Sequence, residues 1–135
     1  MAIKLSTAVR NARLDAIETA IGTSAVLKIR TGSPPADVAT ADSGSVLATM
    51  NLQSDWMAAA ASGSKAKSGT WQETSADGTG DAGHFRIYAS DGTTAHLQGT
   101  VTATGGGGDL TLDNISIASG QVVTVTSFSL TDANS

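Results

Sequence analysis

The sequence predicts a mainly β protein, a β-sandwich or jelly roll with one N-terminal α-helix. Between Asp109 and Thr131, apolar and polar residues alternate as they do in strands with one buried face. Glycine-rich turn sequences recur between short apolar runs, which is typical of sandwiches and jelly rolls. Helical spacing is confined to residues 1–22. Because 135 residues hold one core, we expect an N-terminal helix or arm (1–22) and a β-sandwich (23–135) to form a single domain.

The N-terminal helix is predicted to run from Thr7 to Ile21. Ser6 is a good N-cap, because its hydroxyl can accept a hydrogen bond from the first turn, and Gly22 suits the position after the last turn. The apolar residues form two neighbouring stripes, one of Leu5, Val9, Ala12, Ala16 and Ala20 and one of Leu14, Ile17 and Ile21. We therefore expect the helix to cover either its own sheet or a neighbouring subunit.

The predicted strands are short and are separated by turn residues. They span 25–31, 46–52, 65–71, 84–89 and 95–104, followed by the runs within 109–131. Asp91-Gly92 predicts a hairpin. The lysines of 65–71 suit a sheet edge, where charge discourages pairing with another chain. Phase shifts at Asp113-Asn114 and Thr126-Ser127 predict β-bulges or bends, where a strand passes from one sheet to another.

Alternation within 84–89 assigns its side chains to two faces. Phe85 and Ile87 are expected to face the core, and His84, Arg86 and Tyr88 to face solvent.

Composition favours a structural protein over an enzyme or a nucleic-acid binder. The net charge is -4 and aromatic residues make up 4%, so basic faces and stacking platforms for bases are scarce. Ala, Gly, Ser and Thr account for 71 of the 135 residues, which suits flat sheets and extended contact surfaces. There is no cysteine, so no disulfide or thiolate metal site is expected. We expect no export signal and no membrane span, because no apolar run approaches about 20 residues.

Two histidines are the main candidates for site chemistry. His84 and His96 flank the predicted hairpin and, with Asp81 or Asp91, could bind a metal or act as acid and base. The alternative, which we favour, is two exposed strand residues, because no third ligand is evident.

The remaining chemical motifs are incomplete. Counted from Asp77, a calcium loop would need glycine at its sixth position and glutamate at its twelfth, but these are Ala82 and Tyr88; a weak surface calcium site stays open. The glycines 105–108 lack the Gly-Lys-Ser/Thr of a phosphate loop and predict a flexible connector. We expect no cofactor, no resident metal and no catalytic residue: the only glutamates, Glu18 and Glu73, lie on the helix and at a loop edge.

Five residues are candidates for binding a partner. Arg10 and Arg13 either extend over apolar surface of their own helix or reach an acidic partner, and Lys4 is a further cation available to such a partner. Trp56 and Trp71 are either core residues or anchors of a subunit interface.

The order of several segments resembles small virion structural proteins of tailed bacteriophages, over most of the chain. These segments are Lys4–Ala16, Leu27–Ala36, Phe85–Tyr88, Gly99–Val101, Gly108–Asn114 and Gly120–Phe128. From the resemblance, the size and the fold class, we expect a capsid cement or decoration protein: no enzyme, but a homodimer or homotrimer bound to the major capsid protein on the capsid exterior of the virion. The chain would be made in the host cytoplasm and would bind neither nucleic acid nor membrane. The alternative is a tail or tail-tip adhesion protein that contacts the host surface.

The N-terminal helix is the expected clamp of such a cement protein. Lys4, Arg10 and Arg13 would contact an acidic capsid surface, and deleting residues 1–21 should abolish capsid binding while leaving the β-sandwich folded.

Overall fold

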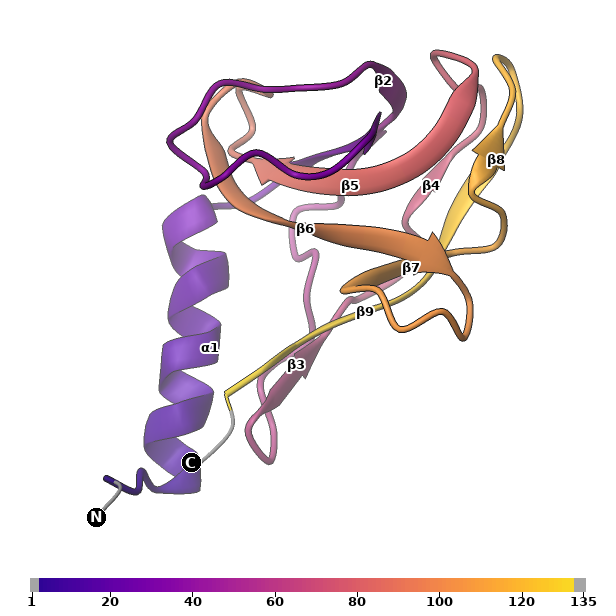
Figure 1. Ribbon diagram of the computed structural model, residues 1–135. Helices are drawn as coiled ribbons and strands as arrows, with labels where there is room; N and C mark the ends of the chain where they lie inside the picture. Colours follow the sequence, from indigo (N-terminus) through magenta and orange to yellow (C-terminus); the bar gives the residue numbers. More distant parts are fainter. Residues whose placement is uncertain (1–2, 133–135) are drawn as a thin grey trace.

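The computed structural model describes residues 3–132, in which one α-helix stands beside a single curled sheet (Figure 1). The helix α1 spans Thr7–Ile21, as the sequence predicts; the Ser6 hydroxyl accepts from the Val9 N–H, and the Gly22 N–H donates to the Glu18 carbonyl. No helix in this part of the chain is long and apolar enough to cross a bilayer. The strands are β1 (Val26–Thr31), β2 (Val46–Asn51), β3 (Ser64–Ala66), β4 (Gln72–Glu73), β5 (Gly80–Tyr88), β6 (Ala95–Ala103), β7 (Leu110–Leu112), β8 (Ser116–Ile117) and β9 (Val123–Thr131).

The prediction of a mainly β protein with one N-terminal helix is confirmed, but the strands do not stack as two sheets. They form one mixed sheet in the order β2-β1-β5-β6-β7-β9-β3, with β4 also paired to β9 and β8 to β5. This sheet curls into a half-barrel (Figure 1). Register shifts interrupt several of its ladders, and such bulges increase local twist, so one long sheet encloses a core that a sandwich would place between two sheets.

Acidic side chains bridge the open side of the half-barrel, between β2 and β4. The Thr49 N–H donates to Glu73 Oε2 at 3.4 Å, and the Thr49 hydroxyl donates to Asp77 Oδ2 at 2.8 Å. The Asp77 N–H in turn donates to the Leu47 carbonyl at 2.7 Å. These contacts satisfy groups on the free edge of β2 that a further strand would otherwise pair.

The core fills the inside of the curl and is centred on aromatic rings. Phe128 lies 5.5 Å from both Trp71 and Phe85, measured between ring centroids, and Trp56 lies 6.0 Å from Trp71. Aliphatic side chains from the facing strands surround the rings, among them Leu27, Ile29, Leu47, Met50, Ile87, Leu110, Leu112, Val123 and Val125.

The four-glycine segment 105–108 forms a tight return between β6 and β7. It is the connector that the sequence predicts, and its flexibility stays a prediction. It brings β7 back beside β6 so that the two strands pair in parallel, Val101 opposite Leu110. The Gly108 N–H donates to the Thr102 hydroxyl at 3.0 Å, and a Cβ on Gly108 would lie 2.8 Å from the Thr102 backbone nitrogen. Glycine is required because the returning backbone passes against β6 with no space for a side chain.

Two strand predictions have opposite outcomes. The bulge expected at Thr126-Ser127 is confirmed: Thr111 pairs with Ser127 and Leu112 with Val125, which leaves Thr126 without a partner in the ladder. The strand expected at 65–71 is only Ser64–Ala66, at the edge of the sheet. Its Lys65 is buried, so it does not provide the exposed charge that we expected to protect this edge.

Candidate functional site

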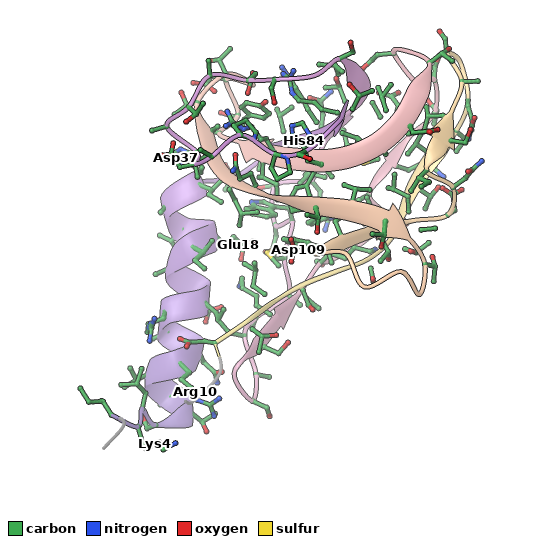
Figure 2. All side chains as sticks on the ribbon, in the orientation of Figure 1. Lys4, Arg10, Glu18, Asp37, His84 and Asp109 are labelled. Carbon is green, nitrogen blue, oxygen red and sulfur yellow. The ribbon has the colours of Figure 1, made fainter. Side chains whose placement is uncertain are left out.

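The N-terminal end of α1 carries a partly apolar, basic surface. Ile3 is 83% exposed and Val9 46% exposed, and with Val122 they are the exposed large apolar side chains among residues 3–132. Lys4 is also exposed at this end, and Arg13 is exposed one turn beyond Val9, near the middle of α1. We call Ile3, Lys4, Val9 and Arg13 the helix-end surface. Figure 2 shows Lys4 at this end of α1, which extends well beyond the strands β1, β2 and β5.

Both predicted partner-binding arginines contact an acidic residue of their own chain. Arg10 Nη1 donates to the backbone carbonyl of Asp132 at 3.1 Å, and Arg13 Nε lies 3.2 Å from Asp132 Oδ2. Arg10 is partly buried, whereas the Arg13 side chain is 61% exposed. These contacts attach the end of β9 to the first half of α1.

A polar stripe fixes α1 to the segment that leads into β3. One side chain from each turn accepts a hydrogen bond from a backbone N–H: Asn11 from Gly63 at 2.9 Å, Asp15 from Ala60 at 3.0 Å and Glu18 from Met57 at 3.0 Å. The stripe therefore protects the outer backbone of this segment, which has no strand beside it, from pairing with another chain.

The ammonium of Lys65 completes this junction from the side of the sheet. Lys65 Nζ lies 2.7 Å from Asp15 Oδ1 and 2.9 Å from Glu18 Oε1, and it donates to the Ala58 carbonyl at 2.9 Å. Burial opposes the charged form, but the hydrogen bonds to Asp15 and Glu18 prevail and raise the pKa of Lys65. The hydrogen bond from Lys65, followed by that from the Ala60 N–H, lowers the pKa of Asp15.

Sequence reasoning missed the polar stripe because it searched α1 for apolar residues alone. The second apolar stripe does face the sheet, through Leu14 and Ile21. In the first apolar stripe, Leu5 is half-buried and the other four residues, Val9, Ala12, Ala16 and Ala20, are exposed. The spacing of Asn11, Asp15 and Glu18 was a detectable signal, since residues four and three apart share one helix face.

The two tryptophans lie in the core beneath the surface. Trp56 is fully buried and its Nε1 donates to the Gly22 carbonyl at 2.9 Å; Trp71 is also buried and donates to the Ser68 carbonyl at 3.1 Å. Between core residues and anchors of a subunit interface, the structure supports core residues for both tryptophans. Trp56 closes the C-terminal end of α1 onto the sheet.

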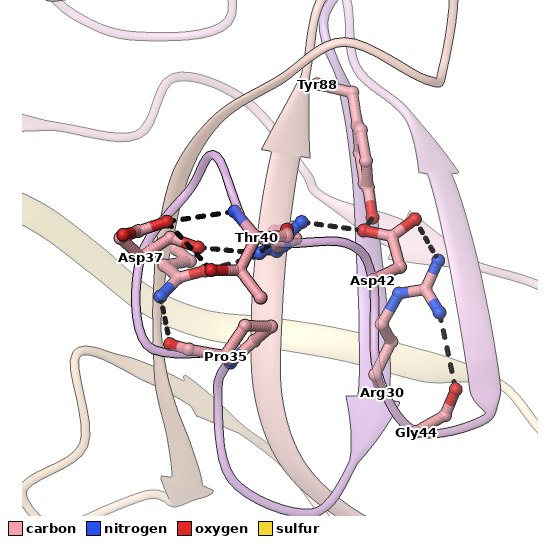
Figure 3. Close-up of polar contacts among 9 residues, drawn as sticks. Arg30, Pro35, Asp37, Thr40, Asp42, Gly44 and Tyr88 are labelled. Atoms are coloured by element: carbon pink, nitrogen blue, oxygen red, sulfur yellow. Dashed lines mark hydrogen bonds and ion pairs between the residues drawn. The ribbon is translucent and has the colours of Figure 1, made fainter.

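A second polar cluster lies on the outer face of β1, β5 and β6, beneath residues 32–45, which we call the strap (Figure 3). Asp42 of the strap accepts hydrogen bonds from Arg30 at 2.9 Å, Arg86 at 2.9 Å and Tyr88 at 2.8 Å. Arg86 also donates to the carbonyls of Asp37 and Thr40. The strap thus replaces solvent as the environment of this face.

This burial corrects the prediction that His84, Arg86 and Tyr88 face solvent, since all three are buried. Burial raises the pKa of Asp42, but the hydrogen bond from Tyr88 and the charges of Arg30 and Arg86 outweigh it, so that pKa lies below its usual value.

The two histidines are not brought together. His84 stands opposite Thr100 in the β5–β6 ladder and is fully buried, whereas His96 is exposed near the hairpin turn. Among residues 3–132, no three His, Asp or Glu side chains are grouped so as to hold a metal ion. The Asp91 carboxylate accepts from Thr94 and Thr93 in the hairpin turn.

The two glutamates also lie apart, and each contacts other residues of the chain. Glu18 pairs with Lys65, and Glu73 accepts hydrogen bonds from Thr49 and Ser75 at the open side of the half-barrel.

Comparison of the chain with protein-family models, with curated proteins and with solved structures finds no match.

Proposed function

We propose that the chain is a capsid cement protein of a tailed bacteriophage, a non-enzymatic virion component that binds the outer surface of the major capsid shell. It would act as a homodimer or homotrimer and bridge neighbouring shell subunits. A protein that binds only the assembled shell stabilises it by mass action, and this needs a rigid body with an exposed contact surface but no active site.

The helix-end surface is the observation that carries this proposal. Two of the three exposed large apolar side chains among residues 3–132 lie there, Ile3 and Val9, beside the cations of Lys4 and Arg13. Single exposed apolar residues are ordinary, but apolar and basic groups gathered at one end of a helix suit a protein contact.

The attachment of α1 to the sheet would let the helix-end surface carry load between a shell subunit and the half-barrel. The polar stripe and Lys65 hold the helix to the sheet along its length, so a force on the helix end is transmitted to the half-barrel. The partner that fits is an acidic, partly apolar patch on the shell. Among described residues, Asp132 already offsets part of the Arg13 charge, so the apolar residues are expected to contribute most of the affinity.

The test is binding to shells purified without this protein, measured by co-sedimentation. Val9→Asp should weaken binding by about tenfold or more, as loss of an interface anchor does. The matched control is Val122→Asp, because Val9 and Val122 are both 46% exposed but Val122 lies just before β9. Asp at position 9 falls in the first turn of α1, where the helix dipole tolerates it, so the fold should be unaffected.

Equal binding by wild type and Val9→Asp would show that the helix-end surface is not the contact with the shell. Copy number in purified virions, measured by gel densitometry against the major capsid protein, tests the broader proposal. A copy number near that of the shell supports cement. A handful of copies per particle contradicts it and favours the alternative, a tail or tail-tip adhesion protein.

A further inference from the structure

We propose that the strap, residues 32–45, is released by acid, and that the trigger is protonation of the buried His84. This inference goes beyond the proposed function and does not depend on it. His84 lies on β5 under the strap (Figure 2), and its side chain is inaccessible to solvent.

Most hydrogen bonds that hold the strap have a donor on the sheet and an acceptor on the strap; in the opposite direction, the Ser45 N–H donates to the Thr31 hydroxyl at 2.9 Å. The donors are side chains of Arg30, His84, Arg86, Tyr88 and Gln98; the acceptors are the Asp42 carboxylate and the carbonyls of Gly32, Pro35, Asp37, Thr40 and Gly44. The strap has no helix or strand, and it contributes no fully buried apolar side chain to the core. Its closure therefore depends on polar contacts, which makes it sensitive to the charge beneath it.

Only one ring nitrogen of His84 has a hydrogen-bond partner. Nδ1 lies 2.9 Å from the Gly32 carbonyl, which can only accept, so the ring proton sits on Nδ1 and Nε2 holds a lone pair. Nε2 is buried and has no hydrogen-bond partner. Protonation would turn it into a charged donor with no acceptor, which is far more costly than an unused lone pair.

Two cationic side chains lie beside His84. Arg30 is its direct cross-strand neighbour on β1 and has a buried, unpartnered Nε; Arg86 follows two residues later on β5, on the same face. The facing carboxylates are already engaged: Asp42 by three donors, Asp37 by Thr40, and Asp109, at the edge of β6, by Thr100. β2 brings Val46 next to Arg30 and no charge.

Opening the strap relieves this conflict, because it gives the protonated ring access to water. The sheet beneath keeps its own ladders and core, so the opening is local.

The test is hydrogen–deuterium exchange of the full chain at about pH 7.5 and about pH 5.5, a range in which histidine ordinarily gains a proton and aspartate stays ionised. Exchange rates are corrected for the intrinsic effect of pH on amides. Because an exposed histidine ordinarily has a pKa of about 6.5, uptake of one proton on opening raises the opening constant by about tenfold between these two pH values, so strap amides should exchange about ten times faster at the lower pH. Unchanged strap exchange in the wild type would overturn the proposal.

Two substitutions identify the trigger. His84→Gln keeps a side-chain N–H for the Gly32 carbonyl but cannot gain a proton, and it should abolish the acid-induced rise. His96→Gln, at the exposed histidine, should leave the rise intact. Asp42→Asn, which removes the carboxylate shared by three donors, should expose the strap at both pH values and marks the fully open state. A rise that persists in His84→Gln would refute the role of His84.

If His84→Gln does not fold, imidazole NMR of the wild type decides the question. Protonation of His84 should follow the same pH dependence as strap exchange. A His84 ring that becomes charged while the strap stays protected, or that stays neutral while the strap opens, contradicts the proposal.

Discussion

The Lys65 ammonium lies 2.7 Å from the Asp15 carboxylate and joins strand β3 to helix α1 across 50 positions of sequence. The two side chains differ in environment: Lys65 is 2% exposed, whereas Asp15 is 48% exposed. Removing the partners of a buried charge is more costly than removing one partly solvated partner, because the buried charge is left without compensation.

The first prediction therefore concerns asymmetry within the Lys65 junction. Asp15→Asn alone should lower the free energy of unfolding only slightly, since Asp15 is partly solvated and Glu18 still pairs Lys65. The double variant Asp15→Asn/Glu18→Gln should lower it by about 3 kcal/mol or more, because Lys65 remains buried and unpaired. Urea unfolding measures both. Lys67→Ala, which removes a partly exposed lysine of the same segment, is the control and should change stability by less than about 0.5 kcal/mol.

The second prediction is loss of stability in acid. Four aspartates have a pKa below the usual value: Asp15 through Lys65, Asp37 through the Thr40 hydroxyl, Asp91 through the Thr94 hydroxyl and, against the effect of burial, Asp42 through Tyr88 and the two arginines. Because each folded pKa lies below the unfolded one, the folded state binds fewer protons. The stabilisation is present above about pH 4 and is lost as pH falls further.

The urea midpoint should accordingly fall as the pH is lowered below about 4. Asp42→Asn should reduce this dependence and also lower stability at neutral pH, whereas Asp55→Asn, at an exposed position, should do neither. Lys65 acts in the opposite sense: its pKa is raised, so its contribution is present below the ordinary lysine pKa and lost as pH rises through the folded one.

The third prediction concerns the close approach of β5 to the strap. A Cβ on Gly83 would lie 2.2 Å from the Gly32 carbonyl oxygen, an overlap that only backbone movement can relieve. Gly83→Ala should lower the free energy of unfolding by about 1–3 kcal/mol and speed hydrogen exchange in the strap. Gly105→Ala is the comparison: its Cβ would meet no atom within 4 Å, and its φ of 86° implies strain alone, about 1 kcal/mol, with no effect on the strap.

The fourth prediction revises the expectation that the β domain folds without its helix. Deleting residues 1–21 would remove Leu14 and Ile21 from the packed interior and leave buried Lys65 without its carboxylates. The shortened chain should lose cooperative unfolding, and the emission of Trp56 should shift to the red as its ring becomes solvated. Deleting only residues 1–3 should leave both properties unchanged. A stable, cooperative fragment 22–135 would show that the junction is dispensable.

Local features of this protein could be predicted from the sequence because short-range interactions determine them. The limits of α1 follow from Ser6 and Gly22, whose roles are satisfied within one helical turn. The hairpin at Asp91 and the bulge at Thr126 follow from turn chemistry and from side-chain alternation. The mainly β class follows for the same reason.

The tertiary structure decided how these elements close around one core. Alternation shows that a strand has two faces, but it cannot show that the strap covers the second face of β5 and buries His84 and Arg86. Nor can it distinguish two stacked sheets from one curled sheet, because both bury one face of each strand.

For the candidate partner-binding residues too, residue type could be predicted from the sequence, whereas burial and contacts depend on the fold. Sequence reasoning identified Lys4, Arg10, Arg13, Trp56 and Trp71 by residue type. Burial then placed both tryptophans in the core, and the fold brought Asp132 to Arg10 and Arg13 from the far end of the described chain. Residue type and spacing determine what a side chain can do within a few residues. Contacts across 50 or 122 positions depend on chain folding, and they decided which acceptors Lys65 and Arg10 meet within the chain.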